Sequence, residues 1–201
     1  MSAKREGKEP RGRRRDDGPL PGRLAAEGPP GDPESVARSI CLRLLTGAPR
    51  TRAQLADALR RRAVPDEVAE RVLGRFSEVG LVDDEAFAQA WVQSRHSGRG
   101  LARRALAQEL RRRGVASEAV DQAFETLGPE EEAETARALV RRKLPATARL
   151  ESHVRFRRLV AMLARKGYRA GLAMTIVREE LGAEGADTEL LPTEDAGEGA
   201  E

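Results

Sequence analysis

Only a few residues of this 201-residue chain have the types and spacing that catalysis or metal binding uses. The acidic run Asp83-Asp84-Glu85 offers carboxylates for a metal ion. Acidic residues at the start of a helix are also stabilised by the helix dipole, and we favour that second interpretation. His96 and His153 follow no metal-ligand pattern, and Gly98-Arg99-Gly100 lacks the third glycine and the lysine of a nucleotide-binding loop. We therefore expect neither catalysis nor a cofactor.

A second group of residues, rich in arginine, recurs three times at a regular spacing. The segments are Leu59–Val64, Leu110–Val115 and Leu163–Tyr168, and their first leucines lie 51 and 53 residues apart. Each segment contains two or three adjacent cations. A period of this size predicts tandem supersecondary units that bury their apolar faces partly against one another.

The cationic ends of these units have two interpretations. Lys and Arg near a helix C-terminus are favoured by the helix dipole, at ~0.3–1 kcal/mol each, and need no other role. Further arginines outside the recurring segments favour a cationic stripe that binds a phosphate backbone or an acidic protein surface. The candidate contact residues are Arg95, Arg99, Arg103, Arg104, Arg111, Arg112, Arg113, Arg141, Arg142, Lys143, Arg155, Arg157, Arg158, Arg165 and Lys166.

The charge balance also favours a polyanionic partner. The whole chain has a net charge of +3, to which Met1–Pro33 contributes +2 and Gly182–Glu201 contributes −7. The remaining body, Glu34–Leu181, therefore carries +8 and should attract nucleic acid or an acidic protein. Because both terminal segments lack apolar periodicity, we predict a disordered arm over residues 1–34 and an acidic disordered tail over residues 182–201.

The elements that position these arginines are predicted to be helices. The composition is 39% hydrophobic and 34% charged with only 3% aromatic residues, and the helix formers Ala, Leu, Arg and Glu dominate. Each unit contains three segments in which apolar residues follow the helical period. We therefore predict an all-α fold of three tandem three-helix repeats, at residues 35–82, 83–129 and 130–181.

Several positions are expected to define the helices locally. Thr51 is predicted to be an N-cap, with Gln54 completing a capping box. Asp66 and Ser117 both lie seven residues after the leucine of their repeated segment, and we predict that they cap the third helix of their units. Val36 is expected to lie on the apolar face of the first helix.

Four other residues are expected to pack in the interior. Cys41 is the only cysteine, so an internal disulfide is excluded, and we interpret it as a small buried hydrophobe. Phe87 and Trp91 lie four apart on one helix and are interpreted as core residues, although stacking on a nucleic-acid base is an alternative if the rings are exposed. Tyr168 takes a core position in its repeated segment, and its hydroxyl must reach water or a partner.

The sequence also bears on where the protein acts. No apolar run approaches the ~20 residues of a membrane span, and the basic N-terminus has no hydrophobic signal segment. We therefore expect a cytoplasmic protein with no membrane partner. A capped repeat with a charged surface favours a monomer.

The chain resembles the bacterial RecX family, most clearly between Gly80 and Val115. The residues that carry the resemblance are Gly80-Leu81-Val82-Asp83-Asp84-Glu85-Ala86-Phe87-Ala88, Trp91-Val92, Ser94-Arg95, Gly98, Leu106, Glu109-Leu110 and Arg113-Gly114-Val115. The resemblance covers about Ser35 to Leu181 and is looser in the third unit.

This resemblance implies both an architecture and a function. The three repeats would form an elongated, curved rod that binds the recombinase RecA, in the groove of its filament on single-stranded DNA. The protein would inhibit the ATPase, strand-exchange and coprotease activities of RecA, and so regulate DNA repair, recombination and the SOS response. No cofactor is implied.

Two alternatives to this function stay open at the level of sequence. One is a duplex DNA-binding protein or transcription regulator, because three-helix units resemble helix-turn-helix modules. However, the third predicted helix of the first unit carries Glu67, Glu70 and Glu78 against only two arginines, which suits a phosphate-lined groove poorly. The other alternative is a protein-interaction adaptor that does not contact nucleic acid.

Overall fold

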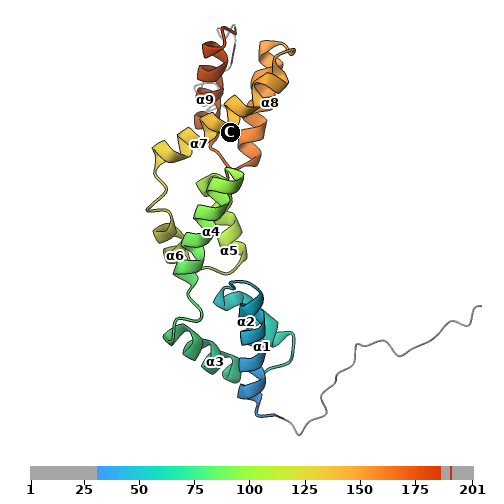
Figure 1. The fold of residues 1–201 in the computed structure, drawn as a ribbon, viewed down its shortest axis with the longest axis vertical. Coiled ribbons are helices and arrows are strands. Elements are labelled where there is room, and N and C mark those ends of the chain that lie inside the picture. Colours follow the sequence, from blue (N-terminus) through green and yellow to red (C-terminus); the bar gives the residue numbers. More distant parts are fainter. Residues whose placement is uncertain (1–30, 187–190, 192–201) are drawn as a thin grey trace, which may run out of the picture. The chain divides into compact units, whose positions relative to one another are not determined.

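The computed structural model describes residues 31–186 and Leu191, and every regular element in that part of the chain is helical. Three separate apolar cores divide the helices into three bundles, which follow one another along the chain (Figure 1). The prediction of an all-α fold with three three-helix repeats is therefore confirmed. The helices are α1 (Pro33–Gly47), α2 (Arg52–Arg60), α3 (Asp66–Glu78), α4 (Asp84–Arg99), α5 (Arg103–Arg112), α6 (Ser117–Ala123), α7 (Pro129–Lys143), a 3-10 turn η1 (Pro145–Thr147), α8 (Ser152–Arg165) and α9 (Ala170–Ala183).

The first bundle, α1–α3, contains the predicted capping box and a buried apolar core. Thr51 accepts a hydrogen bond from the Gln54 backbone at 3.2 Å, and the Gln54 side chain accepts one from the Thr51 backbone, so the predicted capping box is confirmed. Leu55 and Leu73 are fully buried. Cys41 is also fully buried, and burial raises the pKa of its thiol, as expected for a small interior residue.

The second bundle begins at the acidic run. Asp83 is the N-cap of α4 and accepts a hydrogen bond from the Ala86 backbone at 2.9 Å, while Asp84 and Glu85 lie in the first turn. The interpretation of these acids as a helix start is confirmed. The core lies around Leu106, Leu110 and Val120.

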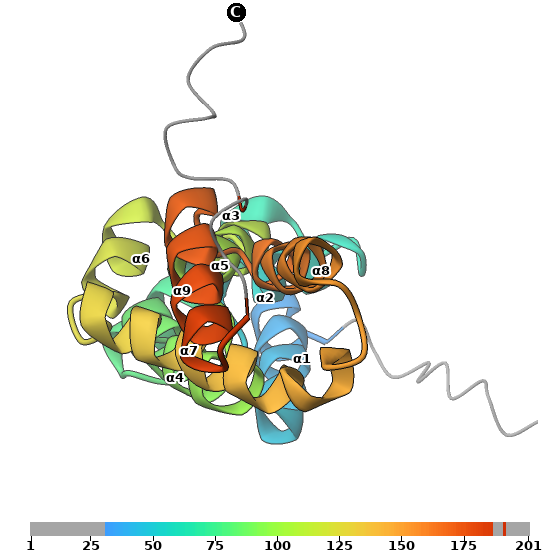
Figure 2. The ribbon, with the colours of Figure 1, turned by 90° about the horizontal axis from the view of Figure 1, so that it is seen from above.

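In the third bundle the three helices are not all parallel to one another (Figure 2). The last helix, α9, packs against both α7 and α8, and Figure 2 shows α7 lying across them. The packed chain reaches beyond the boundary expected at Leu181, because α9 continues to Ala183 and Leu191 is buried in the third core. The remainder of the predicted arm and tail, residues 1–30, 187–190 and 192–201, lies outside the described residues.

Three local predictions are wrong. Val36 is 44% exposed, because the buried face of α1 centres on Ala37, Ile40 and Cys41 and leaves Val36 at its edge. Asp66 and Ser117 are the first helical residues of α3 and α6 rather than their N-caps, and neither side chain accepts a hydrogen bond from its helix. Pro65 and Ala116 occupy the cap positions.

Candidate functional site

The first and second bundles meet at a joint formed by the end of one repeated segment. The Arg113 carbonyl, at the end of α5, accepts a hydrogen bond from the Thr51 hydroxyl at 2.6 Å. The Asp84 carboxylate accepts one from the Arg52 backbone, the first N–H of α2, at 2.8 Å. A Cβ atom on Gly114 would lie 2.2 Å from the Ala53 Cβ, so only glycine allows this approach.

The second and third bundles meet at an equivalent joint. The Ala102 backbone donates a hydrogen bond to the Lys166 carbonyl at 2.9 Å. The Glu132 carboxylate accepts one from the Arg103 backbone, the first N–H of α5, at 2.9 Å. Gly167 has a φ of +92°, and a Cβ there would lie 2.7 Å from the backbone nitrogen of Ala105.

The end of the repeated segment forms the joint in both cases, so the joints as well as the charges account for its recurrence. In each joint, an acid from the next repeat satisfies the first N–H of the preceding repeat's second helix. The corresponding residue of the first repeat is Ala63, which also has a positive φ of 55°, and no bundle precedes it among the residues that the structure describes. Alanine at this position in the first repeat and glycine in the second and third, Gly114 and Gly167, is the sequence signal that marks the two joints.

Two more polar contacts connect the second bundle to the third. His96 is buried, with Nδ1 2.9 Å from the Leu101 carbonyl and Nε2 2.8 Å from the Thr135 hydroxyl. The buried Tyr168 hydroxyl donates to the Gly100 carbonyl at 3.2 Å, which supplies the partner that its core position required. Both side chains therefore position the two bundles.

The titration of Tyr168 should report this burial directly. Burial, and then the charge of Glu132, raise the pKa of Tyr168 above its ordinary value. The unfolded chain loses the phenolic proton more readily, so the contribution of Tyr168 to stability should be constant below about pH 10 and should fall as the pH rises further. Tyr168 is the only tyrosine, so tyrosinate absorbance measures it alone. We expect tyrosinate to form at higher pH in the native protein than in urea, and coincident titrations would contradict the buried hydroxyl.

Four of the predicted contact residues form ion pairs or hydrogen bonds with other residues of the protein. Arg155 is buried and forms an ion pair with Glu184. Arg141 makes two hydrogen bonds of 2.8 Å to the buried Glu180 carboxylate. Arg103 donates to the Leu127 carbonyl at 3.1 Å, and Lys166 donates to the Arg99 carbonyl. These four have local partners that explain their presence.

Two other predicted contact residues surround Trp91. The Arg113 and Arg95 guanidinium carbons lie 3.8 and 4.2 Å from the Trp91 ring centroid. The indole N–H donates to Glu109 at 2.9 Å, and Phe87 stacks beside the indole at 5.7 Å. Phe87 and Trp91 are half-buried at the edge of the second core, so the core-packing interpretation holds in part. The Arg95 and Arg113 guanidinium groups would therefore compete with a base for stacking on the indole ring.

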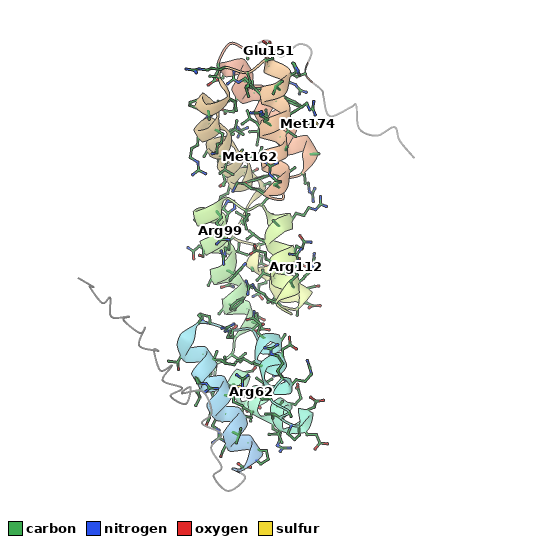
Figure 3. The ribbon with its side chains drawn as sticks, turned by 90° about the vertical axis from the view of Figure 1, so that its right-hand side faces the viewer. Arg62, Arg99, Arg112, Glu151, Met162 and Met174 are labelled. Carbon is green, nitrogen blue, oxygen red and sulfur yellow. The ribbon has the colours of Figure 1, made fainter. Side chains whose placement is uncertain are left out.

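The remaining nine predicted residues are exposed and make no ion pair or side-chain hydrogen bond with the residues that the structure describes. They are Arg99, Arg104, Arg111, Arg112, Arg142, Lys143, Arg157, Arg158 and Arg165. Figure 3 shows two of them, Arg99 and Arg112, on the second bundle, where they belong to α4 and α5.

Part of this exposed set lines two hollows. A cleft of about 690 Å³ between α5, α6 and the starts of α7 and α9 is lined by Arg104, Arg111 and Arg169 and also by the acids Asp121 and Glu132; Arg169 was not among the predicted contact residues. A shallower hollow of about 550 Å³ on α8 is lined by Arg157, Arg158 and Arg165. Each helix thus presents several arginines on one face. Such a surface can bind phosphate oxygens or carboxylates.

The helix dipole accounts for some of these arginines and not for others. Arg111, Arg112 and Arg165 lie in the last turns of their helices, where a cation is favoured. Arg104 lies in the first turn of α5, where the dipole disfavours a cation. Arg157, 53 residues later, occupies the equivalent position of the third repeat, and both Arg157 and Arg158 lie in the middle of α8, away from its C-terminal turn. Arg104, Arg157 and the neighbouring Arg158 therefore have no local stabilising role, which makes them the strongest contact candidates.

Other kinds of site find less support in the described residues. None of the helices there has the length and apolar character that crossing a bilayer requires. Groups of three or more potential metal ligands are likewise not found in residues 31–186 or at Leu191.

The fold defines a helical-repeat protein built from three successive three-helix domains that meet at equivalent joints. Three family models match these domains in order: RecX, first three-helix domain, at residues 37–76; RecX, second three-helix domain, at residues 83–123; and RecX, third three-helix domain, at residues 130–177. The chain belongs to the RecX family.

Individual relatives agree with this assignment. The Regulatory protein RecX of Streptomyces lividans is 63% identical over 166 residues, which cover 83% of this chain and 88% of the relative. The Regulatory protein RecX of Thermobifida fusca is 60% identical, over 88% of this chain and all of the relative. The crystal structure of RecX from Lactobacillus salivarius has the same fold, with a TM-score of 0.68 at 17% identity over 74% of this chain and 96% of that one. The Streptomyces lividans and Thermobifida fusca relatives carry the name of a regulatory protein rather than that of an enzyme.

Proposed function

We propose that this protein binds the RecA filament on single-stranded DNA and inhibits its ATPase, strand-exchange and coprotease activities, acting in the cytoplasm as a monomer. Membership of the RecX family supports regulation as the general role. The family resemblance supplies RecA as the partner. In this proposal the second and third bundles make the electrostatic contacts, with DNA phosphates or with acidic RecA side chains.

The observation that carries the proposal is the set of exposed arginines without local partners at equivalent positions of two successive repeats. A cation that is neither paired nor favoured by its helix gives the free protein little stability. Arg104 and Arg157 are such residues. A polyanion that passes along both bundles would meet a cation at each, and many modest contacts would add up to a salt-dependent affinity.

A measurement of RecA ATPase on single-stranded DNA tests this function. We expect substoichiometric protein to lower the ATPase rate, and we expect the inhibition to weaken as the salt concentration rises. Binding to naked single-stranded and duplex DNA is measured in parallel. Tight duplex binding without an effect on RecA would favour a duplex DNA-binding protein instead. No effect on RecA together with no DNA binding would favour an adaptor for a different protein.

A further inference from the structure

An apolar groove separate from the arginine-lined hollows lies where the first bundle meets the second. It has a volume of about 520 Å³ and is open to solvent on one side. Leu45 and Pro49 form one wall, Leu81 lies at the turn between α3 and α4, and the Phe87–Trp91 pair of α4 forms another side. Leu45 packs against the first core, and Phe87 and Trp91 pack against the second, so the groove lies along the exposed edges of both cores.

The exposure of Leu81 is imposed by the backbone. Both Leu81 and Val82 donate backbone hydrogen bonds to the Phe76 carbonyl, at 2.8 and 3.1 Å, after Gly80 turns the chain with a φ of +72°. This geometry buries Val82 in the first core and leaves Leu81 51% exposed. Leu81 is therefore an apolar side chain held outward, and a partner that covered it would gain hydrophobic stabilisation without reorganising the turn.

The aromatic side of the groove is also held rigidly. The Phe87 and Trp91 rings are stacked at 5.7 Å with an angle of 16° between their planes. Glu109 accepts the indole hydrogen bond, and the Arg113 guanidinium lies against the indole ring. Rigid, half-exposed aromatic rings lose little conformational entropy on binding, as is typical of residues that dominate protein interfaces.

The charges around the groove indicate what kind of segment would fit. Arg50 and Arg95 line it, and Arg50 makes no ion pair within the described part of the chain. Asp83 is the acid that lines the groove, and its carboxylate already accepts the capping hydrogen bond of α4. Arg50 is therefore available to pair with an acid, and Arg95, whose guanidinium lies over the Trp91 ring, adds positive charge beside it, so the groove favours an acidic segment.

We infer that this groove binds an acidic protein segment that inserts one or two large apolar side chains between Leu81 and the Phe87–Trp91 pair. The chain's own N-terminal arm fits less well, because Met1–Pro33 has a net charge of +2. The inference does not depend on what the arginines of α5 and α8 bind, and so it stands apart from the proposed function.

The only tryptophan of the chain lies in the groove, so its fluorescence reports binding there. The probe is a synthetic ten-residue peptide of Asp and Glu with a central Phe-Leu pair. The control peptide replaces that pair by Ala-Ala and keeps the charge. We expect a saturable fluorescence change, with the first peptide binding about tenfold tighter or better than the control. Equal binding of both peptides, or no binding of either, would overturn the inference.

Two variants with the same added charge place the peptide. Leu81→Asp should weaken binding about tenfold or more, because it removes the apolar contact and repels the acids. Val79→Asp should change binding little, since Val79 is 64% exposed but does not line the groove. Equal losses in the two variants would contradict a defined groove.

Two further measurements separate this occupant from others. Neutralising Glu194, Asp195, Glu198 and Glu201 in the full chain should leave peptide affinity unchanged; a large gain would show that the chain's own acidic tail occupies the groove and would overturn its assignment to a partner protein. Oligothymidylate should not displace the peptide. Displacement would show that the groove is a nucleic-acid site and would overturn the inference.

Discussion

Replacing Gly167 by alanine is expected to lower the free energy of unfolding by about 2–5 kcal/mol, from the strain of a left-handed backbone together with overpacking. The φ of Gly167 is +92°, which residues with a Cβ rarely adopt. The new Cβ would also lie 2.7 Å from the Ala105 backbone nitrogen, and a backbone atom at the start of α5 cannot move aside cheaply. Urea unfolding followed by circular dichroism measures the loss.

A glycine in open space provides the matched control. Gly74 lies inside α3, and a Cβ built on it meets nothing within 4 Å. Gly74→Ala should therefore raise the free energy of unfolding by about 0.5–1 kcal/mol, because alanine is the better helix former. We expect the free energy of unfolding to fall in Gly167→Ala and to rise in Gly74→Ala. A neutral or stabilising Gly167→Ala would show that the joint is not closely packed.

The first joint allows the clash to be separated from the backbone strain. A Cβ on Gly114 would meet the Ala53 Cβ at 2.2 Å, while the Ala53 Cα lies at 3.8 Å. Ala53→Gly should therefore recover the part of the Gly114→Ala loss that is due to overpacking. Ala105→Gly should recover little in the Gly167→Ala protein, because the backbone nitrogen of residue 105 remains in place.

The sequence could predict the bundles because the cores depend on local periodicity. Leu59, Leu110 and Leu163, which begin the repeated segments, are all fully buried. Their recurrence required only that apolar residues face inward on each helix. The Thr51 capping box was equally predictable, since both of its partners lie within four residues of the chain.

The joints and the states of the arginines could not be predicted in the same way, because their partners are distant in sequence. Arg141 is paired with Glu180, 39 residues away, and Asp84 reaches the start of α2 across 32 residues. The helical period places Arg155 on the buried face of α8, four residues before Leu159, but it does not show that Glu184, 29 residues away, is the ion-pair partner of Arg155. A single sequence identifies arginine-rich helices but does not show which arginines are left for a partner.

The largest functional effect is expected from Arg104, Arg157 and Arg158 replaced together by glutamine. The three are exposed, without ion pairs among the described residues, and not stabilised by a helix C-terminus. At about 0.5–1 kcal/mol for each lost contact, the concentration needed to inhibit RecA ATPase should rise about tenfold or more. Stability should be nearly unchanged, and Arg104→Gln should even relieve an unfavourable charge at the start of α5.

The salt dependence distinguishes phosphate contacts from other causes of this loss. If the three arginines contact single-stranded DNA, the slope of log affinity against log salt should fall in magnitude by about 2, at roughly 0.7 for each phosphate contact. The matched control replaces Arg43, Arg61 and Arg71 of the first bundle by glutamine, which removes the same charge from exposed positions. Inhibition that weakens equally in both triple variants would mean that net charge, rather than the surface of α5 and α8, controls the interaction. A loss confined to the first-bundle variant would place the contact on the first bundle instead.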